Sequence, residues 1–284
     1  MEFSSVILAA GKGKRMNNPS LPKVLALLDG KPLLDYVLAN VLKLLSEKIV
    51  IVVGHQKENV IQHINENYLS SFNNQFYSDL NNLDLNISDL NNSVLNISAL
   101  KNNSKIVFVE QTEQFGTGHA VYQSVNEFKN YNKSLLILAG DVPLVRKITL
   151  QNFLDNHFKT SSDLSVLTAL AANPTGYGRI IRDNRREFIK ITEEKEANDN
   201  EKQIKEINSG IIAAKADLLF PILNNLKNDN SQGEYYLTDS IALFSEKGFK
   251  VSAFIGAVFD ELQGVNSSED LIKAEEFLRM QNKI

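Results

Sequence analysis

The feature that most constrains the fold is an apolar run at residues 6–10 that passes directly into a glycine-containing loop at 11–16. This pattern is typical of a buried β-strand that ends at a phosphate-binding site. Gly11 and Gly13 can take positive φ values and bring backbone N–H groups close to a ligand. Positive charge for an oligophosphate is available nearby, on Lys12, Lys14, Arg15 and Lys23. A glycine turn with a solvated basic rim would look the same locally, because a lone Gly-X-Gly is a weak signal.

The rest of the chain alternates apolar runs with segments of helical periodicity, and this alternation predicts an α/β fold with a mostly parallel sheet. Continuous apolar runs such as 48–53 indicate strands that are covered on both faces. A hairpin is expected at 179–192, turning near 183–186. Strands are expected at 3–10, 48–53, 105–110, 134–139, 163–171, 205–214 and 250–255. Helices are expected at 33–45, 58–68, 116–127, 149–158, 216–226, 237–247 and 267–281.

Length and composition narrow the class of protein. The chain has 284 residues, and because no linker divides it we expect a single domain over 1–284. The net charge of −4 argues against a general nucleic-acid binder, and the lack of cysteine excludes disulfides, thiolate metal sites and a cysteine nucleophile. No apolar stretch approaches the roughly 20 residues that span a bilayer, and the N-terminus lacks a signal-peptide layout. We therefore expect a cytoplasmic enzyme or binding protein that has neither membrane nor nucleic acid as a partner.

Residues 69–104 interrupt the alternation. The segment is rich in Asn, Ser, Asp and Leu, and it repeats every ten residues from Ser78, Ser88 and Ser98. The repeat is too short for a self-supporting solenoid, which needs about three copies. We interpret the segment as a low-complexity, partly disordered surface insertion. An interaction arm or a short stacked extension is the alternative.

Two loops that follow expected strands carry side chains suited to chemistry. Asp141 comes after the strand at 134–139, where ligands of open α/β sheets collect, and a carboxylate beside phosphates suits Mg²⁺. Gln111 precedes a second loop of small residues, and its amide could read a base through paired hydrogen bonds. The alternatives are an Asp in a tight turn before Pro143 and a helix entry with a threonine cap. The four histidines show no metal-ligand spacing, and no serine or histidine stands out as a member of a catalytic triad.

The loop at 8–16, together with Pro-Lys-Val-Leu at 22–25, resembles the signature of the sugar-phosphate nucleotidyltransferases. Further motifs are similar, in order, to the uridylyltransferase domain of the bacterial N-acetylglucosamine-1-phosphate uridylyltransferases. The similarity runs from about residue 5 to residue 275, apart from the insertion, and motifs in register are far more specific than any one alone. The matching segments are 116–120, 140–144, 174–180, 206–210, 232–239 and 264–266.

The resemblance implies a fold and a reaction. The fold would be a Rossmann-like, mostly parallel mixed sheet flanked by helices, of the nucleotide-diphospho-sugar transferase type, with a small β-rich sugar-binding lobe at about 173–240. In the reaction, the phosphate of N-acetylglucosamine 1-phosphate would attack the α-phosphorus of UTP in line. The products would be UDP-N-acetylglucosamine, a cell-wall precursor, and pyrophosphate. Mg²⁺ and basic side chains would neutralise the repelling phosphates, and the attacking phosphate needs no protein base.

Individual positions match the family's nucleotide and metal contacts. The resemblance implies nucleotide binding by Ala9, Ala10, Gly11, Gln111, Gly116 and Thr117. Within this set, Gln111 and Gly116 would read the uracil. The implied catalytic residues are Arg15, which matches a triphosphate contact, and Lys23, which matches a contact to the phosphates of both substrates. The implied ligands of Mg²⁺ are Asp141 and Asn266.

The sugar side of the site matches as well, with two departures. The resemblance implies sugar binding by Gly176, Glu193, Asn208 and Thr238. The neighbouring Glu194 leaves a one-residue ambiguity at the glutamate, and we favour Glu193. Ser209 replaces the family's threonine and keeps the hydroxyl. Ala139 replaces a tyrosine that is common in relatives, so any contact from that side chain is missing.

Other functions remain as alternatives. Another nucleotide, another sugar 1-phosphate or a polyol phosphate could serve, and a non-catalytic nucleotide-sugar-binding subunit would keep much of the pattern. The presence of Lys23, Asp141 and Asn266 speaks against the silent subunit. A dinucleotide-dependent oxidoreductase is disfavoured because Met16 stands where the third glycine of Gly-X-Gly-X-X-Gly would be. Bifunctional relatives continue into a hexapeptide-repeat β-helix that this chain lacks, so we expect a monofunctional chain that does not form the β-helix trimer, and its oligomeric state stays open.

Overall fold

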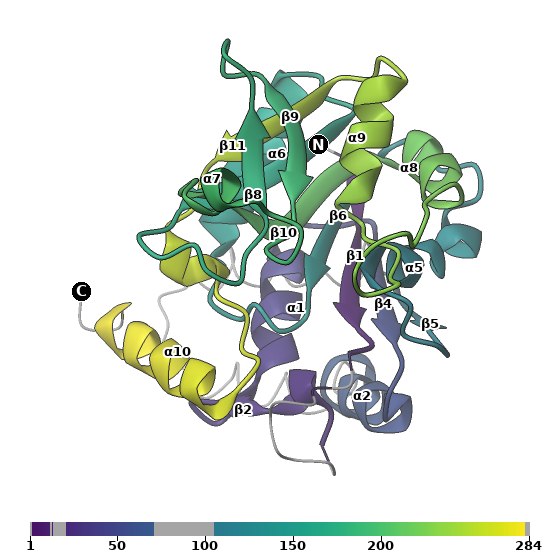
Figure 1. Cartoon of the computed structure of the whole chain (residues 1–284). Helices are drawn as coiled ribbons and strands as arrows, with labels where there is room; N and C mark the ends of the chain where they lie inside the picture. Colours follow the sequence, from purple (N-terminus) through teal and green to yellow (C-terminus); the bar gives the residue numbers. More distant parts are fainter. Residues whose placement is uncertain (1, 12, 14–20, 71–104, 282–284) are drawn as a thin grey trace, which may run out of the picture.

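The computed structural model describes residues 2–11, 13, 21–70 and 105–281 (Figure 1). The predicted insertion lies outside the described residues from 71 onward. The same holds for the basic residues of the glycine loop, Lys12, Lys14 and Arg15, and for Met16.

In the described part of the chain, a nine-stranded mixed sheet forms the centre. Seven strands follow the order β11-β7-β10-β6-β1-β4-β5, and β8 pairs with β10 while β9 pairs with β8 (Figure 1). Pairs β1–β4, β1–β6, β4–β5 and β7–β11 are parallel, whereas β10 is antiparallel to β6 and β7. The predicted mostly parallel mixed sheet is confirmed. The strands are β1 (Phe3–Ala9), β4 (Lys48–Val53), β5 (Lys105–Glu110), β6 (Ser134–Ala139), β7 (Leu164–Leu170), β8 (Arg179–Arg182), β9 (Phe188–Thr192), β10 (Glu206–Lys215) and β11 (Val251–Ile255).

Strand β1 sets the position of the strands on either side of it. It pairs in parallel with β4 and β6, which places Ala9 opposite Val53 and Leu8 opposite Ala139. These strands are apolar along almost their whole length because both of their faces are covered. Their carboxyl ends therefore meet at one edge of the sheet, which is where ligands bind in open α/β sheets.

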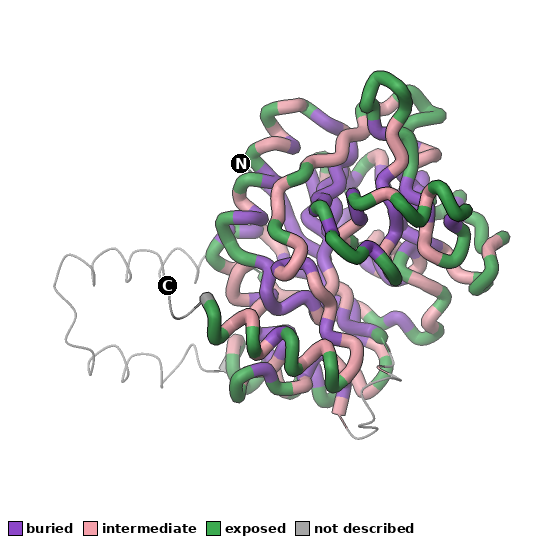
Figure 2. The backbone as a smooth tube through the Cα atoms, turned by 60° about the vertical axis from the view of Figure 1, so that its left-hand side comes forward, coloured by how far each residue is buried: buried purple, intermediate pink, exposed green. Residues whose placement is uncertain are grey.

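Helices cover the sheet on both faces. One core contains residues of α1 (Leu33–Lys43), α2 (Lys57–Ile64) and α6 (Lys147–Lys159), and the other those of α5 (Thr117–Tyr122), α8 (Ala216–Leu223) and α9 (Asp239–Glu246). Successive residues of β1 point to opposite faces, so that Ile7 joins the first core and Val6 the second. Figure 2 shows the buried strands inside a shell of partly exposed segments. The remaining elements include η1 (Lys23–Leu25), the two-residue strands β2 (Leu27–Leu28) and β3 (Lys31–Pro32), α7 (Asp199–Lys202), η4 (Phe259–Leu262) and α10 (Ser268–Gln281).

The predicted hairpin at 179–192 is formed by β8 and β9, with its turn at 183–187. The hairpin joins the main sheet through the pairing of Arg179 with Ile207 of β10. The small β-rich region expected on the sugar side is therefore continuous with the nucleotide-side sheet.

Helices α2, α5, α8 and α9 are each shorter than their apolar patterns predicted, and α2 and α5 continue as helical turns of another type. The pattern at 58–68 gives α2, which ends at Ile64 and continues as a π-helical turn, η2 (Asn65–Ser70). Residues 116–127 form α5 and then a 3-10 turn, η3 (Val125–Phe128), instead of one helix. The α-helix ends before η3 because the buried Ser124 hydroxyl donates to Val121 O at 2.6 Å and competes with the helical backbone bonds. No helix in the described part of the chain is long and apolar enough to cross a membrane.

His157 of α6 is a buried polar group that links two strands. Its Nε2 lies 2.9 Å from Ser134 Oγ of β6, and its Nδ1 lies 2.8 Å from Ser165 Oγ of β7. Burial, helped by the nearby positive charge of Lys215, lowers the pKa of His157 to about 4.

Replacing His157 with Gln is expected to make the free energy of unfolding depend less on pH in the acid range. In the folded protein the imidazole stays neutral down to about pH 4, whereas in the unfolded chain it is protonated below about pH 6.5. On account of this group, the wild type should lose up to about 3 kcal/mol of unfolding free energy as the pH falls through this window. Urea unfolding across the window measures the difference, and equal pH slopes for wild type and H157Q would contradict it.

Candidate functional site

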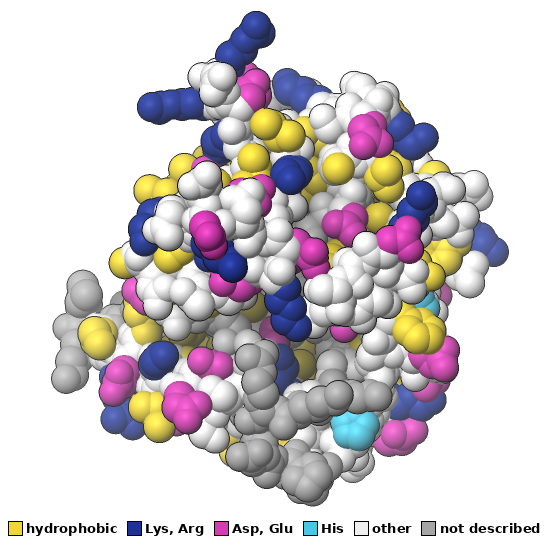
Figure 3. All heavy atoms as spheres, in the orientation of Figure 1, with side chains coloured by type: hydrophobic (Ala, Val, Ile, Leu, Met, Phe, Trp, Pro, Cys, Tyr) yellow, Lys and Arg dark blue, Asp and Glu magenta, His cyan; other side chains and the backbone are white. Residues whose placement is uncertain are grey.

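A cavity of about 270 Å³ lies at the carboxyl edge of β1 and β6. Acidic and basic side chains lie close together across the middle of the face shown in Figure 3. The side chain of Ala9 does not line the cavity, because it is buried in the core beneath the strand end. Seven of the residues predicted on the nucleotide side do line it: Ala10, Gly11, Lys23, Gln111, Gly116, Thr117 and Asp141.

Lys23 joins the two predicted metal ligands. Its ammonium group forms an ion pair with Asp141 Oδ2 and donates a 2.9 Å hydrogen bond to Asn266 Oδ1. The side chains of Lys23 and Asp141 are only 13% and 16% exposed, so water screens the pair weakly. Lys23 lies in η1, Asp141 follows β6 and Asn266 precedes α10, so three distant segments of the chain meet at this point.

The two oxygens that bind Lys23 are suited to Mg²⁺. A carboxylate and an amide oxygen are hard donors, and both already face the same positive charge. The Asn266 amide is oriented by its Nδ2, which donates to Gly264 O at 3.2 Å and leaves Oδ1 for a cation. Within the described ranges, no group of three or more His, Cys, Asp or Glu side chains could hold a metal ion. A pair of protein ligands fits Mg²⁺, which commonly takes its other ligands from phosphates and water.

Gln111 follows β5 and turns its side chain into the loop that it introduces. Its backbone N–H donates to Val53 O at 2.8 Å, which extends the β4–β5 pairing by one residue. Its Nε2 donates to Gly116 O at 3.1 Å and lies 3.0 Å from His119 Nδ1. These contacts fix the amide at the wall of the cavity.

The loop at the start of α5 is fastened to the segment before α9. Gly118 N donates to Tyr235 O at 2.8 Å, and Leu237 N donates to Thr117 Oγ1 at 3.0 Å. Gly116 has a φ of +102°, and a Cβ at this position would come within 2.7 Å of Tyr235 O. Only glycine allows this close approach of the two backbones.

Three of the predicted sugar-binding residues lie together around Gly178. Thr238 Oγ1 donates to Glu193 Oε1 at 2.8 Å. A Cβ on Gly178 would lie 3.4 Å from Glu193 Oε2 and 3.5 Å from Asn208 Cβ, so these side chains flank the glycine. Burial raises the pKa of Glu193, and the hydrogen bond from Thr238 opposes the rise because it stabilises the ionised carboxylate.

Glu194 has different partners from Glu193. Its carboxylate accepts from Arg179 Nη2 at 2.7 Å and from Gly176 N at 3.1 Å. Arg179 is only 1% exposed and also donates to Tyr177 O, so the ion pair holds the loop that carries Gly176. Both glutamates therefore have partners within the protein, and the choice of Glu193 over Glu194 as the sugar contact stays a prediction.

Some residues that shape the site were not singled out from the sequence. Gly178 and Arg179 lie inside the matching segment 174–180. A glycine next to a charged residue in that segment was the sequence signal that could have identified them. Glu234 lines the cavity beside Gly116 and lies inside the matching segment 232–239. Arg15 lies outside the described residues, so its predicted triphosphate contact stays a prediction.

Comparisons with known proteins identify the same family as the sequence motifs do. Residues 4–268 match the family described as nucleotidyl transferase. The chain belongs to the nucleotidyl transferase family. It is 38% identical over 279 residues to the bifunctional protein GlmU of Clostridioides difficile (strain 630), a match that covers 98% of this chain and 52% of that protein. The bifunctional protein GlmU of Lactococcus lactis subsp. lactis (strain IL1403) is 40% identical over the same length, with the same coverage.

The predicted family resemblance is thereby confirmed, and the chain spans about half the length of the curated relatives that it matches. The crystal structure of UDP-glucose pyrophosphorylase complexed with UDP-glucose has the same fold, with a TM-score of 0.72 over 99% of this chain and 100% of that one. The apo form of UDP-glucose pyrophosphorylase gives a TM-score of 0.73. Both structures are 18% identical to this chain, and they confirm the predicted fold class.

Replacing Glu193 with Gln is expected to stabilise the protein near neutral pH. A carboxyl group whose pKa is raised by folding holds its proton more tightly in the folded state, so its favourable contribution is complete at low pH and is lost as the pH rises through the folded pKa. Gln keeps an acceptor for Thr238 and carries no charge. The free energy of unfolding of E193Q should exceed that of wild type above this pKa, by a margin that shrinks in acid.

Denaturant unfolding at two pH values on either side of that pKa measures the margin. Glu187→Gln, at an exposed glutamate in the hairpin turn, controls for the loss of a surface charge. A margin for E193Q that is the same at both pH values would contradict the prediction.

Proposed function

We propose that the protein is a Mg²⁺-dependent UTP:N-acetylglucosamine-1-phosphate uridylyltransferase. The observation that carries the proposal is the contact of Lys23 with Asp141 and Asn266, because Lys23 and Asp141 line the same cavity as Gln111 and Gly116, the positions that match uracil contacts. Membership of the nucleotidyl transferase family and 38% identity to a protein named GlmU support it. The products would be UDP-N-acetylglucosamine, a cell-wall precursor, and pyrophosphate.

UTP would bind at the carboxyl edge of β1. The backbone from Ala9 to Gly11 would approach the nucleotide, because small side chains leave room above the strand end. Backbone N–H groups of this loop are preorganised dipoles that can stabilise phosphate charge. The Gln111 amide, held by Gly116 O, would pair with the edge of uracil.

The main barrier is repulsion between two polyanions, because both the triphosphate and the sugar phosphate carry negative charge. Lys23 would exchange Asp141 and Asn266 for phosphate oxygens of both substrates, and Arg15 would contact the triphosphate. A Mg²⁺ ion held by Asp141 and Asn266 would supply Lewis-acid neutralisation of the phosphates. The phosphate of a sugar 1-phosphate is already anionic near neutral pH, so the attack needs no base from the protein.

The sugar would bind in the small β-rich region. Glu193 and Asn208 flank Gly178, so the carboxylate and the amide could each hydrogen-bond to the sugar. Thr238 would hold Glu193 in place, and Gly176 would approach the sugar in a loop that its own N–H bond to Glu194 and the ion pair of Glu194 with Arg179 fix. The cytoplasmic location of the protein stays a prediction.

Substrate preference is tested by pyrophosphate release from each of the common nucleoside triphosphates, combined in turn with the 1-phosphates of N-acetylglucosamine, glucosamine and glucose. We expect the fastest release with UTP and N-acetylglucosamine 1-phosphate, and none when Mg²⁺ is removed by a chelator. Faster release with another pair would identify a different nucleotidyltransferase. No release with any pair would favour a nucleotide-sugar-binding subunit.

Replacing Asp141 with Ala is expected to lower turnover by at least about 100-fold, because the metal would lose its carboxylate ligand and with it several kcal/mol of charge stabilisation. The fold should persist, since Asp141 lies in a loop at the surface of the cavity. Asp155→Ala, on the exposed face of α6, is the matched control and should keep wild-type turnover. Near-normal turnover of D141A, with thermal melting as the check on folding, would refute the assignment.

A further inference from the structure

The two proposed metal ligands come from separate parts of the chain. Asp141 is the first of residues 141–146, which lie in the loop between β6 and α6, and Asn266 is the last of residues 256–266, which lie between β11 and α10. The two can bind one cation only if segment 256–266 is held against the 141–146 loop. One contact at the metal end does this, because Val265 N donates to Asp141 O at 2.9 Å.

A second contact holds the far end of the same two segments. Glu261 of η4 is completely buried, and its Oε1 accepts from Arg146 Nε at 2.8 Å. Its Oε2 accepts from Thr149 Oγ1 at 2.5 Å. Arg146 ends the 141–146 loop and Thr149 lies in the first turn of α6, so one carboxylate binds segment 256–266 to both the loop and the helix.

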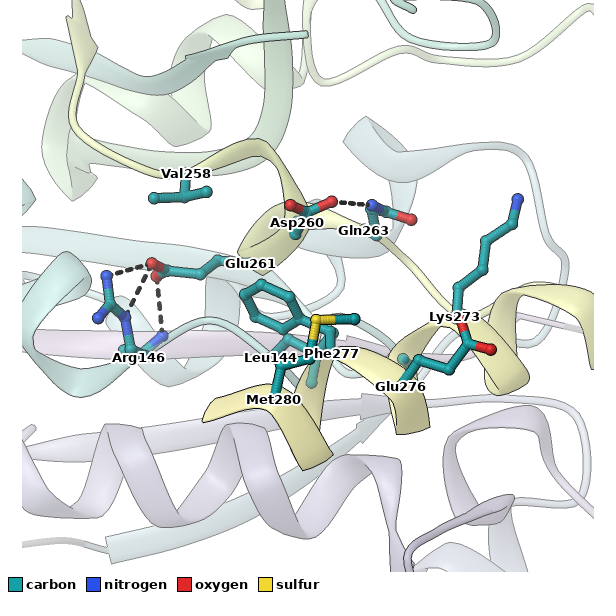
Figure 4. A pocket seen from close by; sticks show the side chains of 11 residues that line it. Leu144, Arg146, Val258, Asp260, Glu261, Gln263, Lys273, Glu276, Phe277 and Met280 are labelled. Atoms are coloured by element: carbon teal, nitrogen blue, oxygen red, sulfur yellow. Dashed lines mark hydrogen bonds and ion pairs between the residues drawn. The ribbon is translucent and has the colours of Figure 1, made fainter. Parts of the chain in front are cut away.

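A cavity borders this contact on one side. A cavity of about 550 Å³ lies between η4, the 141–146 loop and α10, and both Arg146 and Glu261 line it. Figure 4 shows the Glu261 carboxylate pointing toward Arg146 and away from Lys273 and Glu276 of α10. Leu262 and Val265 of the same segment are buried in the core, and the charge-assisted hydrogen bonds of Glu261 add a directional contact on the side where the cavity leaves packing incomplete.

We propose, building on the metal site proposed above, that Glu261 is a positioning residue for that site. Through Arg146 and Thr149 it sets the distance between the Asn266 segment and the Asp141 loop, and thereby the affinity of the site for a divalent cation. Glu261 touches neither substrate nor metal. Its effect is therefore on metal binding first and on turnover only through metal occupancy.

The chain offers a matched control at Glu206. This glutamate is also buried, and it accepts from Arg182 Nε and Nη2 at 2.8 and 2.7 Å and from Thr168 Oγ1 at 2.8 Å. It therefore has the same kinds of partners as Glu261, an arginine and a threonine, but it ties β7, β8 and β10 together instead of the metal loops. The Glu206→Gln variant reproduces the loss of a buried charge without disturbing Asn266.

The test measures binding of Mn²⁺, a paramagnetic substitute for Mg²⁺, in the presence of UTP. Electron paramagnetic resonance of free Mn²⁺ gives the dissociation constants of wild type, E261Q, R146Q, the double variant and E206Q. Loss of an outer contact to a metal site commonly weakens metal binding 10- to 100-fold, and because Glu261 acts at a distance we expect about tenfold. The double variant should bind Mn²⁺ no more weakly than E261Q, because both changes remove the same contact. E206Q should bind Mn²⁺ like wild type.

Pyrophosphate release gives a second measurement. E261Q should need about tenfold more Mg²⁺ for half-maximal rate and should approach the wild-type rate when Mg²⁺ saturates. Wild-type Mn²⁺ affinity in E261Q and R146Q, or equal weakening in E206Q, would overturn the positioning role. If E261Q does not fold, R146Q decides, because its side chain is half exposed. Failure of the wild type itself to bind Mn²⁺ with UTP would instead overturn the proposed metal site and function.

Discussion

The parallel pairing of β1 with β4 and β6 is the constraint on which the candidate site depends. It brings the ends of three strands to one edge, where a Cβ on Gly54 after β4 would lie 2.9 Å from Ala10 after β1. Burial fixes this register, because a slip by one residue would turn every side chain of β1 to the opposite core. The apolar pattern of a strand therefore determines where Gly11 and Asp141 lie, although neither belongs to the core.

Much of the fold could be predicted from the sequence, because buried strands are apolar throughout and helices show their own period. The strands at 48–53, 105–110 and 134–139 have the expected bounds. Helix ends were less predictable, since contacts such as the Ser124 hydroxyl bond decide them. The antiparallel entry of β10 between β6 and β7 also has no local signal, because strand direction depends on how distant segments pack.

Some residues of the candidate site could be predicted from local sequence patterns, and others could not. Asp141 could be found because it follows an apolar strand, whereas Asn208 and Thr238 were reached only through the family resemblance, since no local pattern marks them. Arg179 and Glu261 were not predicted. A charged residue gives no sign in the sequence that it is buried, and its partners, Glu194 for the one and Arg146 for the other, become evident only in three dimensions.

The backbone contact between Gly118 and Tyr235 has a consequence for how such a protein changes over evolution. Gly116, beside Gln111, and Thr238, beside Glu193, lie at either end of this contact. A substitution that reshapes the loop at Gly116 would therefore also shift residues 235–238, whose Thr238 hydrogen-bonds to Glu193. If the proposed function holds, a change in nucleotide preference made at Gly116 would also affect the residues that bind the sugar.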